Sequence, residues 1–156
     1  MARSGYAILD EPKPGTLARY IVNPFWPLLA MMMAGTWLAG PWFIFNAFAL
    51  GSSTRKSEMW LVIGSVLMSI AFLAVMTTLI MYDVFPQTPR PYVHIVLAVI
   101  KLSFAYVIFM RQQRSLALYE YYGGAVRNGA LVLVAGVVMR GVFSGAPWWA
   151  QLLFAI

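Results

Sequence analysis

The chain has no cysteine and a single histidine, His94, among its 156 residues. Without thiols it cannot form disulfides, thiolate metal sites or cysteine-ligated iron–sulfur clusters. One imidazole cannot supply both ligands of a two-histidine haem clamp, and the consecutive residues Met31, Met32 and Met33 point in three directions around a helix. We therefore expect neither a metal site nor a bound cofactor.

Charged residues are also scarce: Asp, Glu, Lys and Arg make up 10% of the chain, against about 25% in soluble domains. Hydrophobic residues make up 62%, and a soluble fold of this length could not bury so much apolar surface. The formal net charge of +6 comes from basic residues scattered near the ends of apolar blocks. This distribution favours anionic lipid headgroups over nucleic acid as the partner.

Four apolar blocks of membrane-spanning length follow one another along the sequence. Because a helix needs about 20 apolar residues to cross the hydrocarbon layer, we predict an all-α, multi-pass integral membrane protein with four transmembrane helices in an antiparallel bundle. The predicted spans are 24–50, 59–85, 91–110 and 125–144, within a single transmembrane domain of residues 23–156. An extended tail, 1–22, precedes them, and a short interfacial segment, 147–156, follows. Little of the chain remains for a soluble catalytic domain.

Gly40 and Pro41 lie within the first apolar block. Proline removes a backbone hydrogen bond and crowds the preceding turn of a helix, so we predict a kink or a break near Trp37 to Pro41. In a bilayer, the carbonyl group freed by such a break needs another partner.

The start of the fourth helix is ambiguous, because the continuous apolar run begins only at Ala130. A start there would place Arg140 near the middle of the helix, whereas a start near Ala125 would place it in the last turns. We favour Ala125, since an arginine close to the membrane boundary can extend its guanidinium to the headgroups at small cost.

Lys101 is the sharpest functional candidate, because it lies about ten residues from either end of the third block, near the middle of the bilayer. A central lysine costs about 2.5 to 3.5 kcal/mol on the translocon scale, while the eleven Leu, Ile, Val and Phe residues of this block return roughly 3 to 7 kcal/mol. The helix can therefore insert without any functional compensation for its lysine.

His94 and Lys101 are seven residues apart and share one face of the predicted third helix. The functional interpretation is an ion or proton path, or a site for an anion or a lipid headgroup. Because the acidic residues lie at the ends of the blocks or outside them, an anion for Lys101 is expected from a partner subunit or from a water-filled cavity. The alternative is a tolerated core lysine bonded to a neighbouring polar group, such as Ser103, Tyr106 or Asn46.

A basic and aromatic segment follows the third block, and the third helix can extend through it as far as Gly123. The residues that predict a surface for a partner or for anionic lipids are Arg111, Arg114, Tyr119, Tyr121 and Arg127. The alternative is a helix end at the membrane interface with ordinary basic and aromatic anchors.

Two functions are compatible with this pattern, and neither is catalytic. The first is a non-catalytic small subunit or assembly component of a larger membrane complex, with other membrane subunits or copies of itself as partners. The alternative is a small homo-oligomeric channel or transporter with an anion-attracting path past His94 and Lys101, and with Arg140 as a third candidate. An enzyme is not expected, because no Ser or Thr within the blocks has a histidine beside it in sequence.

Overall fold

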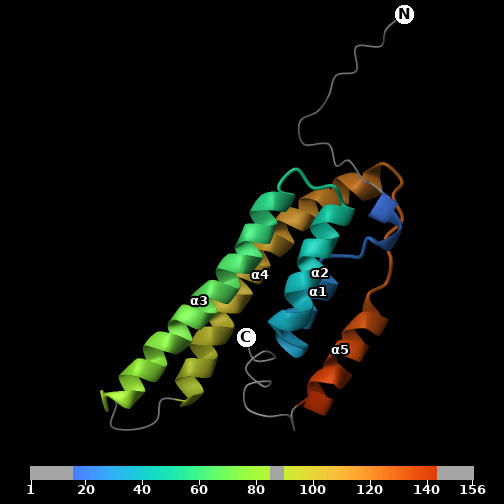
Figure 1. Ribbon diagram of the computed structural model, residues 1–156. Helices are drawn as coiled ribbons and strands as arrows, with labels where there is room; N and C mark the ends of the chain where they lie inside the picture. Colours follow the sequence, from blue (N-terminus) through green and yellow to red (C-terminus); the bar gives the residue numbers. More distant parts are fainter. Residues whose placement is uncertain (1–15, 85–89, 144–156) are drawn as a thin grey trace, which may run out of the picture.

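The computed structural model describes residues 16–84 and 90–143, and within these residues all regular elements are helical. The predicted all-helical class is therefore confirmed. A short 3-10 helix, η1 (Thr16–Tyr20), is followed by five α-helices in the described residues (Figure 1). They are α1 (Phe25–Met33), α2 (Thr36–Ala49), α3 (Arg55–Met81), α4 (Arg90–Tyr121) and α5 (Ala130–Phe143).

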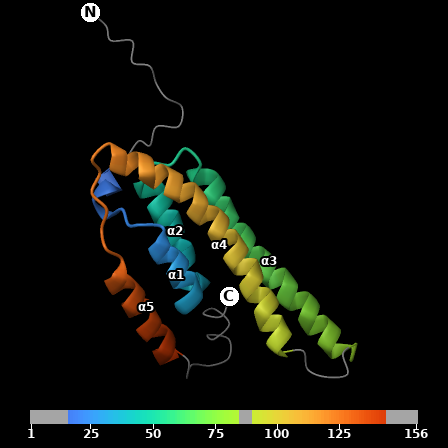
Figure 2. The same ribbon diagram turned by 180° about the vertical axis from the view of Figure 1, so that it is seen from behind.

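The two longest helices, α3 and α4, form an antiparallel pair that extends beyond α1 and α2 (Figures 1 and 2). With a rise of about 1.5 Å per residue, their 27 and 32 residues reach about 40 Å and about 48 Å, more than the roughly 30 Å of hydrocarbon. Their most apolar windows have mean hydropathies of 2.3 and 2.2, and only 17% of each window is buried, unlike the core helix of a soluble protein. Two helices are thus long and apolar enough to cross a membrane, which supports a membrane location.

The first apolar block folds back on itself instead of forming one helix. Val22 N–H donates to Asn46 Oδ1 at 3.1 Å, so the two ends of the block lie together. A straight helix over the same residues would hold these ends about 36 Å apart. The predicted span 24–50 is therefore wrong: α1 and α2 form a hairpin that begins and ends at the same end of the molecule (Figures 1 and 2).

The hairpin turns at Gly35, before the predicted break region at Gly40 and Pro41. Gly35 has a φ of 103°, which glycine adopts easily, and it donates its N–H to Ala30 O at 2.8 Å to close α1. α2 runs through Gly40 and Pro41 without ending. A Cβ on Gly40 would lie 3.2 Å from Val62 Cγ1, so this glycine allows α2 and α3 to approach closely.

The helix of the fourth block begins only at Ala130, so the favoured start near Ala125 is wrong. Residues 124–129 are not helical, because Arg127 pairs through its backbone with the segment before α1. Asn128 Oδ1 then accepts the N–H of Ala130 at 2.8 Å and starts the helix. The 14 residues of α5 reach about 21 Å, so the described helix is shorter than the hydrocarbon layer.

Close packing at Gly129 fixes the position of α5 against the hairpin. A Cβ on this buried glycine would lie 2.7 Å from Trp26 Cγ and 2.8 Å from Trp42 Cζ2. Both tryptophans pack in the main apolar core, together with Leu133 of α5. Only a residue without a side chain therefore allows α5 to start where it does.

Part of the predicted extended tail is folded. Within residues 16–22, η1 is helical and Ile21 is fully buried. Ile21 packs with Leu50 and Leu116 in a second, smaller core, which ties the N-terminal segment to α2 and α4. Residues 1–15 and the predicted interfacial segment 147–156 lie outside the described residues.

Candidate functional site

A cavity of about 450 Å³ lies at the tip of the α1–α2 hairpin and is also lined by α3, α4 and α5. This volume falls within the range of small-molecule sites, about 300 to 1,000 Å³. His94 and Lys101 of α4 and Arg140 of α5 all line it, so the structure brings the three intramembrane candidates together. The other described lining residues are apolar side chains and Gly35. We call this site the basic cavity.

The positive charges of the basic cavity come from different helices. Lys101 is half-buried, and His94 lies two turns earlier on the same face of α4, as the sequence spacing predicts. Arg140 lines the same cavity from α5, so two positive charges belong to one site. Two neighbouring cations favour an anion beside them, because it offsets their mutual repulsion.

Arg140 also binds the backbone at the hairpin tip. Its Nη1 donates to the carbonyl oxygen of Met33 at 2.7 Å, and Trp37 Nε1 donates to Ala34 O at 2.8 Å. Carbonyl groups at the end of a helix have no intrahelical partner and carry a partial negative charge, so these donors stabilise the end of α1. Arg140 therefore contacts the hairpin, whereas the sequence predicted that it would extend to the headgroups.

A second polar cluster, which the sequence did not predict, is buried near the open end of the hairpin. Gln112 Nε2 donates to Glu58 Oε2 at 2.9 Å and to Phe43 O at 2.8 Å, and Gln112 Oε1 accepts from Asn46 Nδ2 at 3.1 Å. Ser52 Oγ donates to Glu58 Oε1 at 2.9 Å. The side chains of Asn46, Ser52, Glu58 and Gln112 are no more than 2% exposed. We call these four residues the polar network.

Sequence reasoning placed Glu58 outside the spans and proposed Asn46 as a partner of Lys101. In the structure, Glu58 is buried in the first turn of α3, and the Asn46 side chain is used in hydrogen bonds to Val22 and Gln112. One signal was readable: Thr54 precedes Glu58 at a helix start, and its Oγ1 donates to Glu58 Oε1 at 2.6 Å. Gln112 gave no signal, since its partners are 54 to 69 residues away along the chain.

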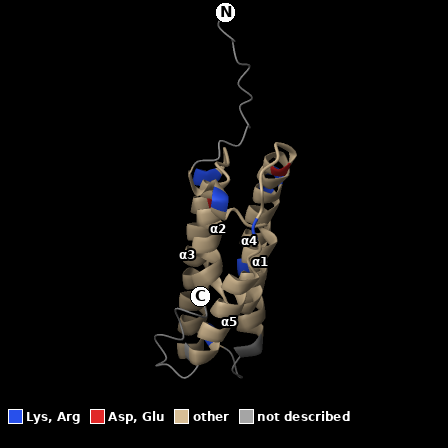
Figure 3. Ribbon diagram, turned by 90° about the vertical axis from the view of Figure 1, so that its right-hand side faces the viewer, with Lys and Arg blue, Asp and Glu red and all other residues tan. Residues whose placement is uncertain are grey.

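The predicted partner surface is divided in the structure. It consists of five residues, Arg111, Arg114, Tyr119, Tyr121 and Arg127. Arg111 Nη1 donates to Ser57 Oγ of α3 at 2.6 Å, whereas Arg127 Nε donates to Arg19 O of η1 at 3.0 Å. Tyr119 packs in the smaller core, while Arg114 and Tyr121 are exposed. Figure 3 shows basic segments at this end of the molecule and further along the helices.

Within residues 16–84 and 90–143, no group of three or more His, Asp or Glu side chains could hold a metal ion. Comparison of the chain with models of protein families, with curated proteins and with solved structures found no match. Function is therefore inferred from the geometry and charge of the cavities themselves.

Proposed function

We propose that this chain is a multi-pass membrane channel or transporter that binds an anion in the basic cavity. The convergence of His94, Lys101 and Arg140 on one cavity carries the proposal. Basic side chains within membrane segments are costly, and they typically mark ion pathways or binding sites. None of the described lining residues is acidic, so the cavity attracts anions.

The hairpin supports the same proposal. Broken helices and re-entrant segments recur at the substrate sites of channels and transporters, where helix ends meet the ligand. Here α2 begins after Gly35, which lines the basic cavity, and no side chain caps this N-terminus. Because the end of α1 and the start of α2 meet at this tip, their opposite partial charges largely offset each other, and the positive charge of the cavity comes from its basic side chains.

The proposal is tested by measuring the flux of anions across the membrane of vesicles that contain the purified chain. Lys101→Met removes one charge from the cavity and keeps an unbranched side chain of similar length. We expect anion affinity to fall about tenfold, which corresponds to about 1.4 kcal/mol. Lys56→Met is the matched control, because Lys56 is exposed in the first turn of α3, outside the cavity.

Chloride and small organic acids are suitable test anions, because the cavity has the volume of a small-molecule site. Efflux that is fast with the unmodified chain, slow with Lys101→Met and fast with Lys56→Met supports the proposal. If the unmodified chain neither binds nor releases any of these anions, or if the two variants behave alike, the proposal is wrong.

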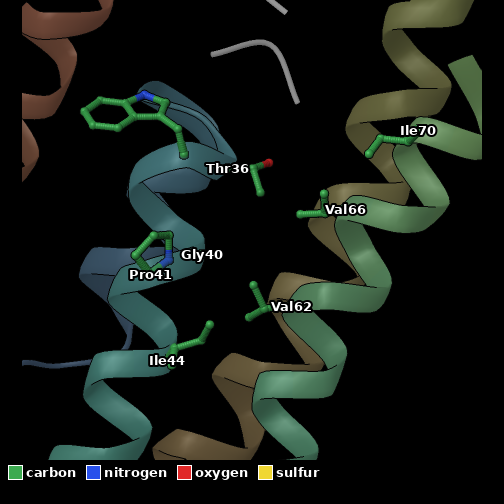
Figure 4. Close-up of a pocket in the computed structure, with 8 residues that line it drawn as sticks. Thr36, Gly40, Pro41, Ile44, Val62, Val66 and Ile70 are labelled. Carbon is green, nitrogen blue, oxygen red and sulfur yellow. The ribbon is translucent and has the colours of Figure 1, made fainter. Parts of the chain in front are cut away.

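A second candidate function is a non-catalytic subunit of a larger membrane complex, and the groove between α2 and α3 favours it. Figure 4 shows Val62, Val66 and Ile70 of α3 facing Thr36 and Ile44 of α2. These residues repeat every four or eight positions, so each set lies along one helix face. The groove has a volume of about 360 Å³ and an apolar lining suited to side chains from a partner's transmembrane helix.

Co-purification from native membranes tests this second function. Val66→Phe fills the groove without changing charge, so it should reduce the amount of any bound membrane subunit and leave anion flux unchanged. The mass of the purified particle in detergent distinguishes another subunit from a second copy of this chain. A monomer that retains no partner under mild extraction would contradict the subunit function.

A further inference from the structure

A larger cavity, of about 620 Å³, lies between α2, α5 and the segment that joins α4 to α5. Trp37, Leu38, Pro41 and Phe45 of α2 form one apolar wall, and Val132 of α5 lies opposite. Three polar residues also line the cavity: Tyr20, Arg127 and Asn128. We call this cavity the Arg127 groove. Its described lining shares no residue with the basic cavity.

The Arg127 groove is apolar along α2 and polar at one end, which we call its mouth. Trp37 lies next to the hairpin tip, and Phe45 lies eight residues later, about 12 Å further along α2. Phe45 precedes Asn46, whose side chain bonds to Val22 at the open end of the hairpin. Arg127 pairs with the same N-terminal segment, so it lies at the open end. The groove therefore runs from a basic mouth along an apolar wall.

The structure holds Arg127 at the mouth. Its backbone N–H donates to Ile21 O at 2.8 Å and its Nε donates to Arg19 O at 3.0 Å, yet its side chain stays exposed. The guanidinium of Arg19 lies 4.7 Å from the centre of the Tyr20 ring, which brings a second positive charge nearby. No described residue that lines the groove is acidic, so the mouth is complementary to an anion.

We propose that the Arg127 groove binds an anionic phospholipid, with an acyl chain along α2 and the phosphate beside Arg127. The apolar wall matches an acyl chain, and the exposed guanidinium matches a negatively charged headgroup. Arginine and tyrosine at the mouth are the residue types that membrane proteins place at headgroup level. Free phosphate would leave the apolar wall uncovered, and a neutral lipid would leave the charge of Arg127 unused.

Tryptophan fluorescence gives a direct test, because Trp37 and Trp42 both line the groove. The purified chain is placed in vesicles of phosphatidylcholine containing either brominated phosphatidylglycerol or brominated phosphatidylcholine, since bromine quenches nearby indoles. Bound anionic lipid should give extra quenching that the brominated neutral lipid does not give. Arg127→Gln should weaken binding of phosphatidylglycerol about fivefold, the effect expected for one basic residue near an anionic surface.

Three further variants define the result. Arg114→Gln removes an exposed arginine outside the groove and should leave the extra quenching unchanged, whereas Arg127→Lys should retain most of it. Val132→Phe fills the groove at constant charge, so it should reduce the extra quenching. It provides an independent test if the Arg127→Gln variant does not fold. Equal behaviour of Arg127→Gln and Arg114→Gln in folded protein, unchanged quenching with Val132→Phe, or displacement of the lipid by inorganic phosphate would overturn the proposal.

The lipid site goes beyond the proposed function and is tested separately from it. Lys101 does not line the Arg127 groove, so Lys101→Met should leave lipid quenching intact. Loss of anion flux in that variant with normal lipid binding supports both proposals. In Arg127→Gln, loss of the extra quenching without any change in anion flux supports a lipid site that is separate from the basic cavity.

Discussion

In the polar network, Gln112 and Glu58 are almost fully buried and Gln112 has a partner for both its amide nitrogen and its oxygen. In the basic cavity, Lys101 is half-buried, and His94 and Arg140 are exposed. Buried polar groups stabilise a fold when each of them is hydrogen-bonded, and they are costly when they are not. The network is therefore suited to holding the helices together, whereas the cavity keeps charge accessible to a ligand.

The largest expected effect is that of Gln112→Met, which removes the centre of the polar network at nearly constant volume. Three buried groups lose a partner, on Phe43, Asn46 and Glu58, and each costs at least about 1 kcal/mol, so we expect a loss of about 3 kcal/mol. Thermal unfolding in detergent measures it. If the variant is as stable as the unmodified chain, the polar network does not hold the helices together, and the contrast with the basic cavity is wrong.

Gly129→Ala tests whether the position of α5 controls the cavity. The added Cβ would lie less than 3 Å from Trp26 and Trp42, so we expect a loss of about 1 to 3 kcal/mol through overpacking. Anion affinity should fall as well, because α5 carries Arg140. Gly141→Ala is the control: its Cβ would meet no described atom within 4 Å, and a gain of up to about 1 kcal/mol is expected in a helix.

Arg140 has a structural contact as well as a place in the basic cavity, since it lines the cavity and also donates to Met33 O. Arg140→Met should cost about 1 kcal/mol of stability, the usual net contribution of one hydrogen bond, and should also weaken anion binding. Arg140→Lys keeps the charge but not the planar fork of donors. If the lysine variant recovers anion affinity and not stability, the two roles of this residue are separable.

The smallest effect is expected for Gln113→Met, one position after the centre of the network. Gln113 Oε1 is buried and has no hydrogen-bond partner among the described residues. Removing an unsatisfied polar group should change stability by less than about 0.5 kcal/mol, or raise it slightly. Thermal unfolding beside Gln112→Met compares the same substitution at adjacent positions. A large loss at Gln113 would show that buried amides matter here regardless of their bonds.

Hydropathy and helix period predicted α3 and α4 and the shared face of His94 and Lys101, because these features are local. The hairpin could not be read in this way, since an apolar run indicates burial or lipid contact and not the direction of the chain. The turn depends on the positive φ of Gly35 and on contacts between residues far apart in sequence. The start of α5 likewise depends on the pairing of Arg127 with the N-terminal segment, which no local pattern reveals.

The hairpin also changes which end of the molecule carries positive charge. A first segment that crosses the membrane would put Arg19 on the opposite side from Arg127, but a hairpin that returns brings the two together, and Arg127 Nε bonds to Arg19 O. The basic residues at this end are then Arg19, Arg55, Lys56, Arg111, Arg114 and Arg127. By the positive-inside rule, we expect this end to face the cytoplasm if the chain spans a membrane. Because the native chain has no cysteine, a single Ser53→Cys variant would report that orientation by one-sided labelling.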